Sequence, residues 1–241
     1  MSTTPRHHFP TAGGAAASRL SDYRLIAFDM DSTLVDIETV DEIAHMAGCG
    51  REVAGITEAT MRGEITDYKE SLRRRVALLR GVPLSFLQTV YDHRLRLNPG
   101  AEALIDACRS AGLRIVLLSG GFTFFTDRLR DRLQLDDTRA NLLEIEDGHL
   151  TGRLLAQPWG DICDGEAKRD KLLACCRAMG ISPAQTIAVG DGANDLPMLR
   201  AAGLSVAYRA KPAVREAAML RIDEGGLDRL LEVLPYARPD A

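Results

Sequence analysis

Hydrophobic and polar positions along the chain fall into two alternating kinds of segment. Short apolar runs that end in a turn or a polar loop are typical of strands buried on both faces of a parallel sheet. The longer segments between them carry apolar residues at helical spacing. The predicted strands are residues 25–28, 114–118, 186–189 and 204–207, and the predicted helices are residues 101–111, 122–133, 168–179 and 195–202. This alternation predicts an α/β fold, a doubly wound parallel sheet with helices on both faces.

Two longer segments interrupt the alternation. Residues 37–98 are helical by pattern, and we expect them to form a small domain, the cap, over the ends of the strands. In residues 141–155, Asp147 and Gly148 stand between alternating apolar segments, which is a strong signal for a β-hairpin. We expect that hairpin to be structural. The predicted helices of the cap are residues 41–47, 52–61, 67–79 and 84–94. The predicted division is a core of residues 22–36 and 99–235, a cap of residues 37–98, and tails of residues 1–21 and 236–241.

Composition narrows the class of protein. A net charge of −4 argues against a nucleic-acid partner, which would need a basic face. No apolar stretch approaches the roughly 20 residues that cross a bilayer, and the N-terminus has no secretory apolar region. The five cysteines form an odd set without the spacing of a metal site, and they fit a reducing compartment. We therefore expect a cytoplasmic protein that binds neither membrane nor nucleic acid, as a monomer or a homodimer.

Polar side chains gather where predicted strands end. Asp29 and Asp31 follow the first strand, Ser119 follows the second, and Asp191 and Asp195 follow the third. Ligands of open α/β sheets bind outside the carboxyl ends of the strands, so these side chains should converge. Gathered carboxylates repel one another unless a cation compensates them, and Mg²⁺ prefers one or two carboxylates with water and substrate phosphate. The sequence therefore predicts a magnesium site at which one of the two paired aspartates attacks phosphorus.

These residues resemble the four motifs of the haloacid dehalogenase superfamily. Asp29-x-Asp31-x-Thr33 resembles its first motif, Ser119 its second, Lys168 its third, and residues 191–195 its fourth. A closer resemblance, to the phosphoserine phosphatases of that superfamily, covers about residues 25–213 and includes segments 38–44, 61–64 and 71–76. It implies a Rossmann-like core with a small helical cap. It also implies hydrolysis of O-phospho-L-serine, the last step of serine biosynthesis.

The resemblance assigns the chemistry to particular carboxylates. Asp29 would attack phosphorus and become an aspartyl phosphate. Asp31 would protonate the leaving serine oxygen and later deprotonate the attacking water, which requires a raised pKa. Magnesium would be held by Asp29, the backbone carbonyl of Asp31, Asp191 and waters. Asp195 would orient these ligands rather than join them.

It also assigns the phosphate contacts. Ser119 and the amides of Gly120 and Gly121 would bind phosphate oxygens. Lys168 would supply positive charge to the phosphoryl group and to the nucleophile. Asn194 would contact phosphate or substrate.

Substrate selectivity should lie in the cap. Glu38 resembles the glutamate that binds the ammonium of phosphoserine, and Arg75 resembles the arginine that takes its carboxylate. On the predicted helix, Arg75 lies at the edge of the apolar stripe, whereas Arg74 points farthest from it. Met61 and Tyr68 would line the apolar part of the pocket. Tyr68 stands where a phenylalanine is usual in these phosphatases, and residues 64–70 are one residue longer.

Other functions share these motifs. The same residues would serve a phosphotransferase that passes the phosphoryl group to a second alcohol such as homoserine, or a phosphatase for another small metabolite. A response-regulator receiver also has an acidic pocket and a lysine in a doubly wound sheet. Receivers are shorter, have no helical insertion after the first strand, and lack a second aspartate for acid–base work, which argues against that class.

Overall fold

The computed structural model describes residues 19–62 and 64–236 of the chain, so residues 1–18 and 237–241 of the predicted tails lie outside the described residues. The strands are β1 (Leu25–Phe28), β2 (Arg114–Phe122), β3 (Asp137–Glu146), β4 (His149–Leu155), β5 (Thr186–Gly190), β6 (Leu204–Tyr208) and β7 (Leu220–Ile222). They form one sheet in the order β4-β3-β2-β1-β5-β6-β7, and every neighbouring pair is parallel except β3 with β4. The predicted doubly wound sheet is confirmed.

Helices cover both faces of the sheet because its central strands are apolar on both sides. In β1, Ile26 and Phe28 join one hydrophobic cluster and Leu25 and Ala27 join the other. The first cluster includes side chains of α5 (Ala101–Ser110), α6 (Thr123–Leu133) and α10 (Leu230–Val233). The second includes side chains of α7 (Gly165–Met179), α8 (Leu196–Ala201) and α9 (Pro212–Ala217). Burying both faces leaves the strand ends as the place for polar chemistry.

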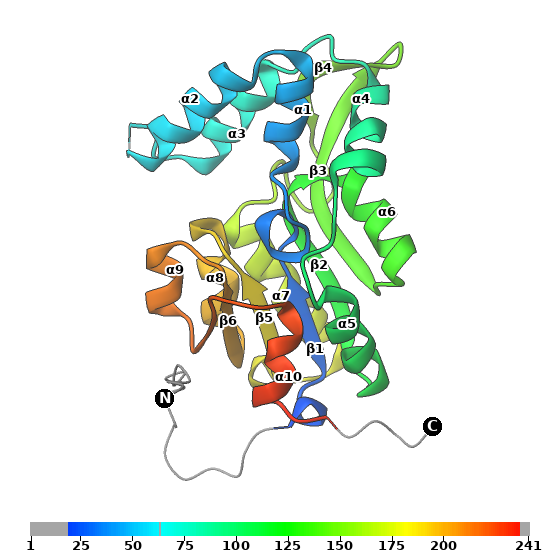
Figure 1. Cartoon of the computed structure of the whole chain (residues 1–241), viewed down its shortest axis with the longest axis vertical. Helices are drawn as coiled ribbons and strands as arrows, with labels where there is room; N and C mark the ends of the chain where they lie inside the picture. The colour runs from blue at the N-terminus through cyan, green and yellow to red at the C-terminus, as the bar shows by residue number, and fades with distance from the viewer. Residues whose placement is uncertain (1–18, 63, 237–241) are drawn as a thin grey trace, which may run out of the picture.

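Four helices of the insertion gather beyond the carboxyl ends of the strands (Figure 1). They are α1 (Thr39–Ala47), α2 (Gly50–Met61), α3 (Tyr68–Ala77) and α4 (Leu84–Thr89). Single turns of 3-10 or π geometry lie at Leu20–Asp22, Val90–Arg94, Pro183–Gln185, Ala193–Asp195 and Leu227–Arg229. Met30–Leu34 is a tight turn whose backbone is non-helical at Asp31 and Ser32. Apolar residues of the cap belong to the same hydrophobic cluster as one face of the sheet. The cap is therefore packed onto the core rather than tethered to it.

The predicted hairpin is the edge of the sheet and supports the cap. Asp147 and Gly148 form its turn with positive φ angles of 47° and 73°, as a tight hairpin requires. Strand β3 first runs parallel to β2 and then pairs antiparallel with β4. Leu150 of β4 exchanges backbone hydrogen bonds with the turn after α3, donating to Val82 O (2.9 Å) and accepting from Gly81 N (2.7 Å). The hairpin thus joins the sheet to the cap. No helix in the described part of the chain is long and apolar enough to cross a membrane.

Candidate active site

The first acidic loop turns sharply as it leaves β1. Asp29 ends the strand, and its backbone N–H still donates to Val189 O of β5 (2.9 Å). Asp31 is extended, whereas Ser32 has φ 57° in the left-handed region, which reverses the chain within two residues. Thr33 then donates from Oγ1 to Asp191 Oδ1 (3.2 Å). The turn therefore brings the two acidic loops into contact.

A buried lysine joins the nucleophile candidate to the second loop. Lys168 Nζ lies 2.5 Å from Asp29 Oδ1 and 2.6 Å from Asp195 Oδ1, and the lysine side chain is fully buried. Burial disfavours the ammonium, but the carboxylates of Asp195 and Asp29 outweigh it and raise the Lys168 pKa above its usual value. An unpaired charge at this depth would be strongly unfavourable, so the three groups stabilise one another as a set.

The other oxygen of Asp195 is also engaged. Its Oδ2 accepts hydrogen bonds from the backbone N–H groups of Asp191 (3.1 Å) and Gly192 (3.0 Å). Both oxygens of Asp195 therefore serve the protein itself. Asp195 therefore holds Lys168 and the backbone of Asp191 and Gly192 in place.

Three carboxylates are close enough to share a cation. Ligand oxygens of Asp29, Asp191 and Asp195 all lie within 4.8 Å of one another, and all three residues are buried. Burial, followed by the charges of Asp195 and Glu38, raises the pKa of Asp191 to about 6. Burial also raises the pKa of Asp29 well above its usual value. Such mutual destabilisation of hard oxygen ligands is what a divalent metal ion relieves, so the donor set fits one.

Asp31 points away from this cluster, towards the start of α1. Its two oxygens accept hydrogen bonds from the backbone N–H (3.2 Å) and hydroxyl (3.1 Å) of Thr39. Burial, together with the charge of Glu38, raises the pKa of Asp31 well above its usual value. A carboxyl group held in place with a raised pKa is suited to proton transfer.

The glycine-rich segment at the end of β2 is fixed by a residue that sequence reasoning missed. Asn141 Nδ2 donates to Gly120 O (2.8 Å) and Gly121 O (3.1 Å), and its Oδ1 accepts from Cys163 N (2.7 Å). The Gly121 amide, which we expected to face phosphate, instead donates to Ser119 Oγ (2.8 Å). The Gly121 amide is therefore already engaged within the loop, whereas the Ser119 hydroxyl serves in that bond only as an acceptor.

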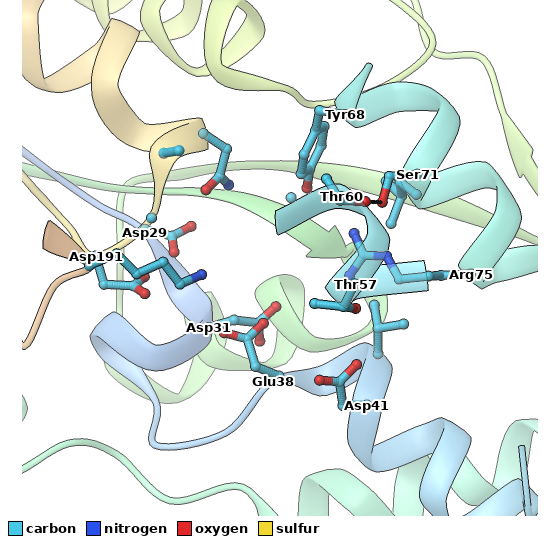
Figure 2. Close-up of a pocket in the computed structure, with 17 residues that line it drawn as sticks. Asp29, Asp31, Glu38, Asp41, Thr57, Thr60, Tyr68, Ser71, Arg75 and Asp191 are labelled. Carbon is cyan, nitrogen blue, oxygen red and sulfur yellow. Dashed lines mark hydrogen bonds between the residues drawn. The ribbon is translucent and has the colours of Figure 1, made fainter. Parts of the chain in front are cut away.

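A cavity of about 580 Å³ separates these groups from the cap. Figure 2 shows Glu38, Asp41, Tyr68 and Arg75 around it. Of the expected site residues, those that line the cavity are Asp29, Asp31, Glu38, Tyr68, Arg75, Gly120, Asp191 and Asn194. Ser119 and Lys168 are fully buried and do not line it. The side chain of Met61 lies outside the described parts of the structure.

The arginines of α3 divide as the helical pattern predicts. Arg75 lines the cavity. Arg74 pairs with Glu70 (2.7 Å) and its side chain is 54% exposed. Arg73 reaches across to Asp161 of the core (2.5 Å), in the loop that follows β4.

Several lining residues were missed because only the fold brings them to the cavity. Asp41 and Lys211 add one acid and one base, and Thr57, Thr60 and Ser71 add hydroxyl groups from the cap. Asp41 follows Glu38 by three residues, a spacing that places both at one side of a helix start. That spacing is the one signal in the sequence that could have found any of them.

Comparison with known proteins agrees with this geometry. The family model of haloacid dehalogenase-like hydrolases matches residues 26–200. A phosphoserine phosphatase of Polaromonas sp. is 68% identical over 216 residues, which is 90% of this chain and 92% of the relative. A solved phospho-aspartyl intermediate analogue of phosphoserine phosphatase superposes with a TM-score of 0.81 at 38% identity, covering 88% of this chain and 99% of that one. A substrate-bound phosphoserine phosphatase complex superposes with a TM-score of 0.81 at 37% identity, covering 88% and 98%. The chain therefore belongs to the haloacid dehalogenase-like hydrolases and, within them, to the phosphoserine phosphatase family.

Proposed function

We propose that this chain hydrolyses O-phospho-L-serine to L-serine and phosphate, through an aspartyl phosphate on Asp29. One observation carries the proposal: the strand-end carboxylates and the cap residues Glu38 and Arg75 line the same cavity. A phosphate ester bound at the strand ends would thus present its amino-acid part to one acid and one base. The relatives named phosphoserine phosphatase, at up to 68% identity, support this substrate.

The first step forms a bond between Asp29 and phosphorus. One oxygen of Asp29 is held by Lys168, which leaves the other to attack in line. The nearby ammonium also favours the anionic form of Asp29 that attack requires. The ester P–O bond breaks, and the serine oxygen leaves.

Asp31 serves both proton transfers. In its protonated form, which burial favours, it donates a proton to the departing serine oxygen. The resulting carboxylate then takes a proton from the water that attacks the aspartyl phosphate, and this step releases phosphate and restores Asp29. Thr39 holds the carboxyl group during both transfers.

Asp29, Asp191 and the backbone carbonyl of Asp31 would hold Mg²⁺, with Asp195 orienting them. A bound divalent ion would neutralise negative charge on the phosphoryl group. The other phosphate oxygens would face the Ser119 hydroxyl, the Gly120 amide and Asn194. Lys168 would add positive charge from behind Asp29.

The cap would select the substrate. Glu38 would take the ammonium, Arg75 the carboxylate, and Tyr68 the apolar part between them. We treat residues 37–98 as the cap domain and the rest of the described chain as the catalytic core. We further propose that the enzyme acts in serine biosynthesis in the cytoplasm, a setting in which its five free thiols stay reduced.

A phosphate-release panel tests the proposed function. Phosphorylated amino acids and sugars would be compared with and without magnesium, and phosphoserine with magnesium should be preferred. Acid-quenched mass spectrometry should place phosphate on Asp29. A different best substrate would refute the substrate assignment, and phosphate on another residue would refute the mechanism. With homoserine added as an acceptor, phosphotransfer would appear as consumed phosphoserine without an equal amount of free phosphate.

A further inference from the structure

The cavity contains an acid that none of the roles above uses. Asp41 lies on the first turn of α1, three residues after Glu38, and both residues line the cavity. In Figure 2 the two carboxylates lie on the side of the cavity formed by α1, and Arg75 enters from α3. Asp41 and Arg75 thus lie on the cap side of the cavity, and Glu38 lies between Asp41 and Asp31 (Figure 2).

Asp41 differs from the acid beside it in lacking a partner. Within the described residues, Asp41 Oδ1 is buried and accepts no hydrogen bond. Glu42, on the same helical turn, pairs with Arg94 at 2.6 Å. Both acids interact favourably with the N-terminal end of the helix dipole. The helix dipole therefore does not explain why, among the described residues, Asp41 and not Glu42 has a buried oxygen without a hydrogen-bond donor.

The opposite wall has the complementary feature. Arg75 Nε is buried and, within the described residues, donates to no acceptor. An open donor and an open acceptor in one cavity match a ligand that carries one group of each kind, as the carboxylate and ammonium of an amino acid do. A buried polar group left without a partner is unfavourable, so both atoms gain from such a ligand.

Glu38 alone does not complete the ammonium site. Its Oε1 already accepts a hydrogen bond from Ser32 Oγ (2.7 Å), whereas an ammonium has three N–H donors to place. Burial and then the charge of Glu38 raise the pKa of Asp41, and Arg75 opposes them. A cation that binds between the two acids would relieve their repulsion.

We propose that Asp41 is a specificity-determining residue that accepts a second hydrogen bond from the substrate's ammonium, beside Glu38. The inference rests on the proposed function. It makes the amino group a requirement for tight binding, because two adjacent carboxylates without a cation between them repel an anionic ester that lacks that group.

The test uses three substrates that separate the two charged groups of phosphoserine. They are O-phosphoserine, O-phosphoethanolamine, which lacks the carboxylate, and O-phospho-3-hydroxypropanoate, which lacks the amino group. Asp41→Asn should lower kcat/KM by about tenfold or more on the first two, as loss of a charge-assisted hydrogen bond does. On the third substrate kcat/KM should not fall, since no charge-assisted bond is lost there and one of the two repelling carboxylates is removed. Asp41→Ser, which is smaller, carries the same expectation if the amide variant folds poorly.

Glu42→Gln is the matched control. It removes the same charge from the same helical turn, away from the cavity, and should leave the ratio of the three kcat/KM values unchanged. Equal losses on all three substrates for Asp41→Asn would overturn the inference and mean that Asp41 supports the fold. Loss on the two carboxylate-bearing substrates alone would overturn it in favour of a role in orienting Arg75. If the wild-type enzyme itself hydrolyses the three esters equally well, the proposed function fails along with the inference.

Discussion

A methyl group added at Gly120 would test how closely the cap approaches the phosphate loop. The Cβ of an alanine at this position would lie 2.0 Å from Tyr68 Oη, whereas ordinary van der Waals contact begins at 3.4 Å. The two atoms would therefore have to separate by more than an ångström. Because Tyr68 begins α3, the strain would push the cap outward. Overpacking of this kind costs about 1–3 kcal/mol of folding free energy. The Tm should therefore fall, and kcat/KM should fall to the extent that the displaced cap no longer closes on phosphoserine.

The second substitution comes from the tyrosine side of the contact. Tyr68→Phe removes the clashing hydroxyl, and the next closest atom of that side chain, Cζ, would lie 3.2 Å from the added methyl group. A shift of a few tenths of an ångström accommodates that distance. The third neighbour, Asn194 Nδ2, is at an ordinary 3.6 Å. Gly120→Ala should therefore be damaging in the parent protein and much milder in the Tyr68→Phe background.

A double-mutant cycle measures this coupling. We would determine kcat/KM for phosphoserine and the Tm of the parent, both single variants and the double variant. Tyr68→Phe alone should be nearly silent, and the cycle should give a coupling of about 1–2 kcal/mol in favour of the double variant. Additive effects would refute the reasoning. They would mean that the methyl group obstructs bound phosphate or the backbone rather than Tyr68.

Three further predictions follow from the same geometry. Arg75→Ala should lower kcat/KM for phosphoserine about tenfold to 150-fold through loss of a charge-assisted pair, and should leave kcat/KM for a small generic phosphate ester unchanged. Arg74→Ala should change neither value. Equal losses on both esters for Arg75→Ala would contradict a contact with the substrate's carboxylate. Asp161→Asn removes ion pairs between core and cap whose side chains are 35–49% exposed, so KM should rise by less than about fivefold, and the effect should vanish at high salt. Magnesium should raise the Tm more at about pH 7.5 than at about pH 5. Metal binding needs an ionised Asp191, and the raised pKa of Asp191 keeps its carboxyl group protonated at the lower pH. An equal rise in Tm at both pH values would argue against Asp191 as a metal ligand.

Strand positions could be predicted where apolar runs meet a polar loop, and not elsewhere. Strand β1 begins and ends as predicted because four apolar residues stand between polar ones. Strand β3 begins at Asp137, in a polar stretch that shows no strand pattern, because its pairing with β2 comes from tertiary contact. Strand β7 has only three residues, too few for a period to appear. Helix α7 begins three residues before Lys168, where the side chain of Asp164 accepts a hydrogen bond from Ala167 N and caps the helix.

The candidate site shows a similar division. Aspartates that directly follow a strand could be predicted, since the chain position of a strand end already fixes their location. Asn141 could not be predicted, because its role depends on hydrogen bonds from β3 to the carbonyls of Gly120 and Gly121, which only the folded sheet brings close. In the sequence Asp41 looks ordinary, because acids are common on the first turn of a helix. The structure shows that, among the described residues, its buried Oδ1 accepts no hydrogen bond.

The burial of the charged groups indicates which of them can be substituted to alter substrate choice without unfolding the protein. Lys168, Asp29 and Asp195 form a buried set, and removing Lys168 leaves two buried carboxylates without their cation, a loss of about 3–5 kcal/mol. Glu38, Asp41 and Arg75 are partly exposed at the cavity wall, and replacing one of them strands no fully buried charge. Substitutions there change which ester binds without unfolding the core. The residues of phosphoryl transfer at the strand ends thus also contribute to the stability of the core, whereas the residues of substrate choice belong to the cap and do not.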